Sequence, residues 1–357
     1  MGTKDTRDEK AQLMDALDDL EREKGVNKEV LFQAIESALI SAYRRNFGSA
    51  QNVRVHLNRE SGATEVYAQK TVVPAVQDHR LEVSRDEAAS IVPGAVDGDI
   101  VEFEITPKNF GRIAAQTAKQ VIVQRIREAE RGMIYDEYSG REGDIVTGMV
   151  QRVERGLVFI DLGRTEAILM PSEQVPGEIL RPNERVKLYV VEVKKTTKGP
   201  QVYLSRSHPG LIRRLFELEV PEIHDGVVDI RGLAREPGAR TKIAVWAEDE
   251  NVDPVGACVG SKGQRVQAIV NELRGEKLDI IAWDPDPAAF VSNALSPARV
   301  TEVEIDTETR SARAIVPDNQ LSLGIGKEGQ NARLAAKLTG WRVDLRAESQ
   351  IERGGFW

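Results

Sequence analysis

Gly260-Ser261-Lys262-Gly263 and Gly326-Lys327-Glu328-Gly329 are two similar tetrapeptides that stand 66 positions apart in this 357-residue chain. Each is followed by residues whose apolar positions repeat at helical spacing. Glycine lacks the Cβ that would block another backbone, and the N-terminus of the next helix offers free N–H groups to a phosphate. One such tetrapeptide is common by chance, but two in similar surroundings indicate a duplicated unit that binds the backbone of a nucleic acid.

The predicted contact residues of this duplicated unit lie in the two loops and in the first turns of the helices that follow. Lys262 and Lys327 add a positive charge to their loops. The predicted RNA-binding residues of the repeat are Gly260, Ser261, Lys262, Gly263, Gln264, Arg265, Gly326, Lys327, Glu328, Gly329, Gln330 and Arg333.

Residues 207–350 form an internal repeat, with one copy at 207–283 and the other at 284–350. In each copy, periodicity predicts a helix, two strands, a short helix, the glycine loop, a second helix and a strand. This αββααβ order is that of a bacterial-type KH domain, whose Gly-x-x-Gly loop clamps about four nucleotides. Because the junction Trp283–Pro287 is short, we expect the two copies to pack together as one rigid surface.

Residues 138–206 have the rhythm of a small β barrel, with short strands predicted at 145–153, 157–162, 166–170, 185–193 and 201–205. Five strands of this kind suit an oligonucleotide/oligosaccharide-binding (OB) barrel. The stretch 143–150 (GDIVTGMV) resembles the RNA-binding OB modules of ribosomal protein S one. The predicted RNA contacts of the barrel are Arg152, Arg155, Phe159 and Lys187.

Strong base stacking is not expected of this barrel, because it offers few surface aromatic residues. Only Phe159, Tyr189 and Tyr203 are available, and Met170 stands where such modules often carry an aromatic residue or histidine.

Residues 1–137 read as an α/β head that ends in a long connector helix. Leu13, Leu17 and Leu20 repeat at helical spacing up to Gly25, and Asn27 is a candidate N-cap for a second helix. Alternating patterns predict strands near 53–57, 66–73 and 101–105. A long helix is predicted from Gly111, and its densely charged end indicates a connector. The fold class is therefore multidomain α+β.

Net charge argues against a strongly basic nucleic-acid binder, since the chain carries −8 overall. Only residues 138–206 are positive, with 11 basic against 9 acidic side chains. A polar N-terminus, no apolar run near the ~20 residues of a membrane span and a single cysteine predict a soluble cytoplasmic protein. Modest, local RNA binding is expected, aided by a partner that holds the protein near its RNA.

Three other interpretations of the motifs are disfavoured. Residues 324–329 also spell G-x-G-x-x-G, and Asp344 lies 18 positions past the central glycine, as in a dinucleotide site. However, seven residues separate this motif from the preceding predicted strand, whereas a Rossmann glycine turn follows its strand directly. Residues 256–262 fail as a P-loop because serine precedes the lysine. The glycine loops could also be ligand-free helix–helix turns, which the duplication makes less favourable.

No catalytic or metal-binding constellation is predicted. Cys258 falls on the apolar side of a short helix and is expected to be a buried structural thiol. The four histidines are scattered, and the acidic residues around Asp284 and Asp286 suit turns beside proline. We therefore expect no enzymatic activity, no cofactor and no metal.

The combination of head, connector helix, OB barrel and two KH domains resembles the NusA family of bacterial transcription factors. Stretches typical of that family lie at Val30–Gly48, Thr106–Arg131, Ile280–Ala298 and Leu323–Arg333. The resemblance implies binding to core RNA polymerase at the RNA exit channel, contact with nascent single-stranded RNA, and modulation of pausing, termination and antitermination with other antitermination factors. It implies a monomer. Some members add acidic helical repeats after the second KH domain, and because this sequence ends at Trp357 without them, regulation by such repeats is not expected. The alternative is a free-standing RNA-decay or translation-associated protein built from the same modules.

Binding to polymerase would explain how an RNA-binding protein can carry a net charge of −8. If the head is anchored on polymerase, the emerging RNA is held at high effective concentration, and the RNA surface need not be strongly basic.

Overall fold

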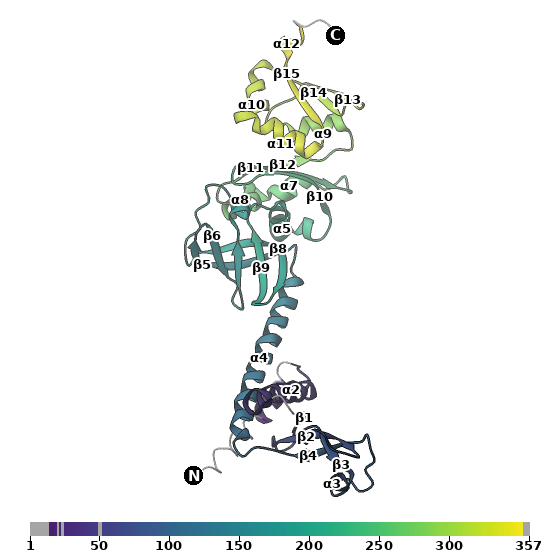
Figure 1. Ribbon diagram of the computed structural model, residues 1–357. Coiled ribbons are helices and arrows are strands. Elements are labelled where there is room, and N and C mark those ends of the chain that lie inside the picture. Colours follow the sequence, from purple (N-terminus) through teal and green to yellow (C-terminus); the bar gives the residue numbers. More distant parts are fainter. Residues whose placement is uncertain (1–13, 20, 23–24, 49–51, 353–357) are drawn as a thin grey trace. The chain divides into compact units, whose positions relative to one another are not determined.

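The computed structural model describes residues 14–19, 21–22, 25–48 and 52–352, which fall into two compact units (Figure 1). The first unit ends at Met133 and the second begins at Ile134. The architecture is the expected multidomain α+β fold.

The first unit contains a four-stranded sheet in which one strand pairs with the other three. Its strands are β1 (Val53–Leu57), β2 (Thr64–Val73), β3 (Glu82–Ser84) and β4 (Ile100–Glu104). The long strand β2 runs antiparallel to β1 and β4 and parallel to β3. Alternation in the sequence predicts three of these strands. It misses β3 and helix α3 (Arg85–Ala89), because elements of three and five residues are too short to show a period.

Helix α2 (Lys28–Phe47) packs on this sheet through one apolar face. Asn27 caps it as predicted, because its Oδ1 accepts hydrogen bonds from the backbone N–H groups of Glu29 and Val30. Residues 14–19 and 21–22 are also helical, and Leu17 is fully buried in the same core. The predicted partners Leu13 and Leu20 lie outside the described residues. Helix α4 (Phe110–Ser139) is the predicted long helix and begins one residue earlier than expected.

The second unit opens with the predicted five-stranded barrel, closed in the order β5-β6-β7-β9-β8. Its elements are β5 (Ile145–Glu154), β6 (Leu157–Asp161), β7 (Glu166–Leu169), the 3-10 turn η1 (Pro171–Glu173), β8 (Arg185–Thr196) and β9 (Gly199–Ser205). Val150, Ile160 and Leu204 fill the interior and are fully buried. Gly148 is required by this packing, because a Cβ there would lie 2.2 Å from the Ile160 side chain.

Two similar αββααβ domains follow. The first contains α5 (Pro209–Glu219), α6 (Pro221–His224), β10 (Val228–Glu236), β11 (Arg240–Ala247), α7 (Pro254–Val259), η2 (Ser261–Gly263), α8 (Gln264–Glu272) and β12 (Lys277–Ala282). The second contains α9 (Pro287–Ala294), β13 (Glu302–Asp306), β14 (Ser311–Val316), η3 (Asp318–Gln320), α10 (Leu321–Ile325), η4 (Lys327–Gly329), α11 (Gln330–Thr339), β15 (Arg342–Ala347) and α12 (Glu348–Glu352). In both sheets the central strand is antiparallel to the first and parallel to the last.

The two domains of the repeat share a hydrophobic core, which agrees with the short linker between them. Ala234, Ala244 and Ile281 of the first sheet are buried in one cluster with Phe290 of α9 and Leu334 of α11. The opposite face of that sheet is covered by α5, α7 and α8 of its own domain. The first sheet is therefore buried on both faces, as Figure 1 also shows for α11 above β11 and β12.

A buried ion-pair network joins the barrel to the first repeat domain. Arg206, 1% exposed, pairs with Glu178 of the barrel and with Glu272 of α8. Its guanidinium also donates hydrogen bonds to the backbone carbonyls of Lys187 and Glu272. Such a charge is stable inside a protein only when its donors are used, so this network fixes the contact between the two domains.

Candidate nucleic-acid interface

The two glycine loops have nearly identical backbones. Gly260 and Gly326 begin them at φ 72°, ψ 177° and φ 74°, ψ 172°. The third residues are left-handed, with φ 51°, ψ 27° at Lys262 and φ 54°, ψ 27° at Glu328. The final glycines of both loops are left-handed as well. A backbone that recurs with different side chains supports the predicted duplication at the level of geometry.

The first and last glycines of each loop serve different purposes. A Cβ on Gly326 would lie 2.8 Å from the Cβ and 2.9 Å from the backbone N of Asn331, so this glycine is needed for packing on α11. A Cβ on Gly260 would lie 2.7 Å from the Cγ of Arg265. A Cβ on Gly329 would meet nothing within 4 Å, and one on Gly263 only Val266 at 3.8 Å. The open space at the fourth position is available to a ligand backbone.

The middle residues of both loops face solvent. Ser261, Lys262, Lys327 and Glu328 are all exposed. Within the described parts of the chain, the ammonium groups of Lys262 and Lys327 make no ion pair. They can therefore meet a phosphate without first breaking an internal contact.

Arg265, a predicted RNA contact, already has partners inside the first repeat domain. Its guanidinium pairs with Glu222 at 2.8 Å and donates to the Ala257 carbonyl at 2.6 Å. The pKa of the Glu222 carboxyl lies below its ordinary value, mainly because its own backbone N–H donates to it and then because Arg265 does. Arg265 therefore holds the short helix in front of the loop, and phosphate contact would compete with this role.

Arg333 and Gln330 are likewise used internally, across the boundary between the two repeat domains. Arg333 pairs with Glu236 at 2.7 Å, and Gln330 donates to the same carboxylate at 2.8 Å. The Arg333 guanidinium, followed by other contacts, holds the pKa of Glu236 below its ordinary value. Sequence reasoning could not find this bridge, because its partners lie 94 and 97 positions apart.

Arg152 and Phe159 lie side by side on the barrel. The Arg152 guanidinium stands 3.8 Å from the centre of the Phe159 ring, and it also pairs with Glu154 and Glu166. Across neighbouring strands, Arg152, Phe159, Ile168 and Tyr203 pair in one row. The Lys194 Nζ lies 5.3 Å from the centre of the Tyr203 ring. The barrel thus presents two aromatic rings, each already accompanied by a cation.

The other residues predicted on the barrel are placed differently. Arg155 is exposed in the β5–β6 turn at φ 52°. Lys187 lies on β8, where its backbone N–H donates to Glu272 of the next domain. Tyr189 is expected from the sequence to be available as a surface aromatic residue, but its ring stacks on His208, with ring centres 4.5 Å apart. The junction between the barrel and the first repeat domain uses both Lys187 and Tyr189.

A basic corner of the first unit was not predicted. Tyr43 at the end of α2 contacts Phe110 at the start of α4, with ring centres 5.7 Å apart. This contact brings together two cationic segments more than 60 positions apart in sequence. The four exposed side chains are Arg44, Arg45, Lys108 and Arg112, and none makes an ion pair in the part of the chain that the structure describes. The corner suits an acidic partner or a phosphate.

The structure argues against a dinucleotide site at residues 324–329 and against a reactive thiol at Cys258. The motif at 324–329 follows helix α10 and not a strand, so it lacks the Rossmann context. Cys258 is fully buried, as expected, and burial together with nearby Glu222 raises its pKa to about 12. Among the described residues there is no group of histidine, cysteine and carboxylate side chains able to hold a metal. In the same residues, no helix is both long and apolar enough to cross a bilayer.

Four family models match the chain in one consecutive series. The NusA N-terminal domain matches residues 12–132, and the S1 RNA binding domain matches residues 140–205. The NusA-like first KH domain matches residues 206–283, and the NusA-like second KH domain matches residues 287–353.

Curated relatives match over almost the entire chain. Transcription termination/antitermination protein NusA of Bacillus subtilis (strain 168) is 58% identical over 347 residues, which cover 97% of this chain and 94% of that protein. The protein of the same name from Halalkalibacterium halodurans is 59% identical and covers 97% and 91%. The solved N-terminal domain of the B. subtilis protein is 62% identical, with a TM-score of 0.32 over 34% of this chain and 98% of that one. With such identity extending through all four domains, the chain belongs to the NusA family.

Proposed function

We propose that this protein is an RNA-binding transcription factor that associates with bacterial RNA polymerase near the RNA exit channel and modulates pausing, termination and antitermination. The observation that carries the RNA part is the duplicated loop backbone, with exposed Lys262 and Lys327 and open space at Gly263 and Gly329. The relatives' shared name supports transcription as the process, and not RNA decay or translation.

In this proposal, nascent single-stranded RNA crosses the two KH domains. The loops accept phosphates through backbone N–H groups and lysines, and about four nucleotides fit each loop. The row Arg152–Phe159–Ile168–Tyr203 on the barrel offers a second contact for bases. Because Arg152 already covers Phe159, a base must displace or stack beside that guanidinium, and the barrel should contribute less than the loops.

The first unit is proposed to bind core polymerase, as a monomer and together with other antitermination factors in the cytoplasm. The basic corner at Arg44, Arg45, Lys108 and Arg112 is one surface available for an acidic or phosphate-bearing partner. No catalytic role is proposed for any residue. Anchoring would compensate for the net charge of −8, because tethering raises the local concentration of RNA.

The RNA part is tested by replacing both middle residues of each loop with aspartate in the full chain. Ser261→Asp with Lys262→Asp, and Lys327→Asp with Glu328→Asp, make each loop more negative where the phosphates would lie, although Glu328→Asp itself leaves the charge unchanged. All four side chains are exposed, so folding should be unchanged by circular dichroism. We expect most of the RNA affinity to be lost in an anisotropy titration, and unchanged affinity in both variants would refute the RNA assignment.

The polymerase part is tested with the two halves of the chain. Residues 1 to about 137 should bind core polymerase and retain part of the pause stimulation, whereas residues from about 138 to 357 should bind RNA and pause poorly. Absence of polymerase binding by the first half at micromolar concentration would refute this part while leaving the RNA assignment intact.

A further inference from the structure

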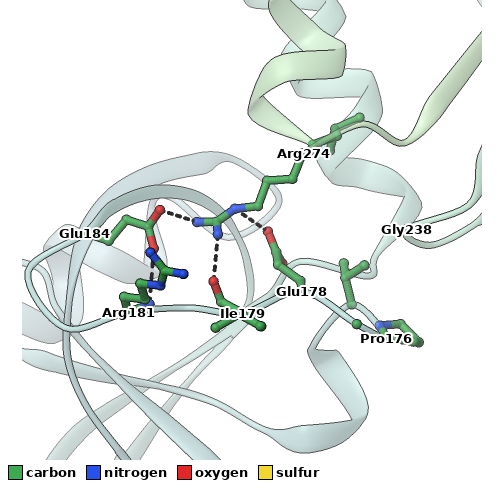
Figure 2. A pocket seen from close by; sticks show the side chains of 10 residues that line it. Pro176, Glu178, Ile179, Arg181, Glu184, Gly238 and Arg274 are labelled. Carbon is green, nitrogen blue, oxygen red and sulfur yellow. Dashed lines mark hydrogen bonds and ion pairs between the residues drawn. The ribbon is translucent and has the colours of Figure 1, made fainter.

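A pocket with a volume of about 440 Å³ lies where the barrel meets the first KH domain (Figure 2). Its floor is the segment 175–184 between β7 and β8. The KH domain contributes Gly238 from the β10–β11 turn and Leu273 and Arg274 from the end of α8. This volume is in the range of small-ligand sites. The pocket is separate from both glycine loops and from the aromatic row of the barrel.

The pocket is held in shape by contacts that leave little freedom. Arg274 is left-handed at φ 56° and reaches from the KH domain to three acceptors of the barrel (Figure 2). It pairs with Glu178 at 3.0 Å and Glu184 at 2.7 Å, and donates to the Ile179 carbonyl at 2.7 Å. A Cβ on Gly238 would lie 2.6 Å from Val175, so only glycine allows this approach. Such a preformed site loses little entropy when a ligand binds.

The pocket is lined by two carboxylates, Glu178 and Glu184, that are both bonded to Arg274, and by one exposed cation, Arg181; these groups suit a flat ring with a phosphate on the Arg181 side. Nε and both Nη atoms of Arg274 already donate in the plane of the guanidinium, so its faces remain for stacking on an aromatic ring. Ile179 is 68% exposed, the highest value among the large hydrophobic residues that the structure describes. Arg181 is exposed, and its guanidinium makes no ion pair with any described residue. A nucleobase between Ile179 and Arg274, with its phosphate at Arg181, would use the Arg274 face, the exposed Ile179 side chain and the free Arg181 charge.

Helix α8 connects this pocket to the first glycine loop. It begins directly after Gly263 and ends beside Arg274, a span of about 15 Å at 1.5 Å per residue. Its exposed positions form one stripe, Gln264, Gln267, Ala268 and Asn271, at helical spacing. The stripe carries no acidic side chain, and its amides can donate to and accept from bases and 2′-hydroxyls. Glu272 lies off the stripe and bonds the Lys187 backbone instead.

We propose that this pocket is an additional RNA contact, which holds the base of one unpaired nucleotide from the strand that the first KH loop clamps. The inference rests on the proposed RNA-binding function and extends it. The RNA would leave the loop along the amide stripe of α8, place one base against the Arg274 guanidinium and Ile179, and place a phosphate at Arg181. The barrel and the first KH domain then read one continuous strand across their fixed junction.

The test uses the full chain with Ile179→Ser and Arg181→Ala combined, since both side chains are exposed and neither forms part of the domain junction's ion pairs. The matched control combines Leu218→Ser and Arg141→Ala, two exposed positions away from the pocket. Two unstructured RNAs of one repeating sequence are titrated by anisotropy. One has about four nucleotides, the length that a KH loop clamps, and the other is three times as long.

We expect the pocket variant to lose about tenfold in affinity for the long RNA, as for one weakly stacked base, and to bind the short RNA like the unchanged protein. The control should bind both RNAs normally. Unchanged affinity of the pocket variant for the long RNA overturns the proposal. A variant that binds both RNAs normally but loses core polymerase also overturns it, because the pocket would then hold a protein side chain. If the unchanged protein binds neither RNA, the proposed function itself fails.

Discussion

Lys262 and Glu328 occupy the same left-handed position in two loops of matching backbone, yet they carry opposite charges. Their φ and ψ angles agree within 3°, at 51° and 27° against 54° and 27°. Both are exposed. The two KH domains therefore present the same backbone to RNA with different electrostatics, and the first loop should contact phosphate more strongly than the second.

This asymmetry predicts opposite effects of reversing each charge. Lys262→Glu should lower RNA affinity and Glu328→Lys should raise it, each by about fivefold, or roughly 1 kcal/mol. Anisotropy titrations at fixed low salt measure the change. Glu308→Lys, at an exposed turn of the second KH domain, is the control for net charge alone. An equal gain from Glu308→Lys would show that the loop position is unimportant.

The two glycines of the second loop should respond differently to alanine. Gly326→Ala places a methyl group against the Asn331 backbone at a φ and ψ that only glycine adopts easily, and should reduce the free energy of unfolding by about 3 kcal/mol. Gly329→Ala meets open space and should cost only about 1 kcal/mol, but should lower RNA affinity by crowding the ligand backbone. Chemical denaturation and anisotropy separate the two effects. Equal stability of both variants would contradict the packing role of Gly326.

Arg206→Met should destabilise the junction between the barrel and the first KH domain by about 3 kcal/mol or more. The substitution removes a buried charge and leaves Glu178, 5% exposed on its side chain, with Arg274 as its remaining partner. Arg152→Met breaks exposed pairs on the barrel and should cost less than about 1 kcal/mol. Thermal unfolding of both variants under the same conditions gives the comparison. A smaller loss for Arg206→Met than for Arg152→Met would mean that the buried network is dispensable.

RNA affinity should depend only moderately on salt. With about 4–6 phosphates of a single strand contacted, the slope of log K against log salt should be roughly −3 to −4. The candidate cations are Lys262, Arg265, Lys327 and Arg333 on the KH domains and Arg152, Arg155 and Lys187 on the barrel. Because Arg152, Arg265 and Arg333 already pair with carboxylates, we expect a slope nearer −3 than −4. A slope near −10 would reveal a large basic surface, and a slope near zero would point to a ligand other than nucleic acid.

The sequence by itself determined the elements and their order. Helical and alternating periodicities are local properties, so they predicted the barrel strands, the αββααβ repeat and the Asn27 cap directly from neighbouring residues. The glycine loops were recognisable for the same reason, because their conformation is set within four residues. Short elements with fewer residues than one clear period needs, among them β3, α3, α6 and α12, were missed.

Only the tertiary structure decided which charged side chains are free. Whether Arg265, Arg333 and Arg206 are free or already paired depends on carboxylates 28 to 97 positions away, and no local pattern encodes that pairing. The same holds for the basic corner that Tyr43 and Phe110 assemble, and for the pocket that Arg274 closes against the barrel. Periodicity reports which face of an element is buried, whereas ion pairs and pockets form where faces of distant segments meet, and that meeting is a property of the folded chain.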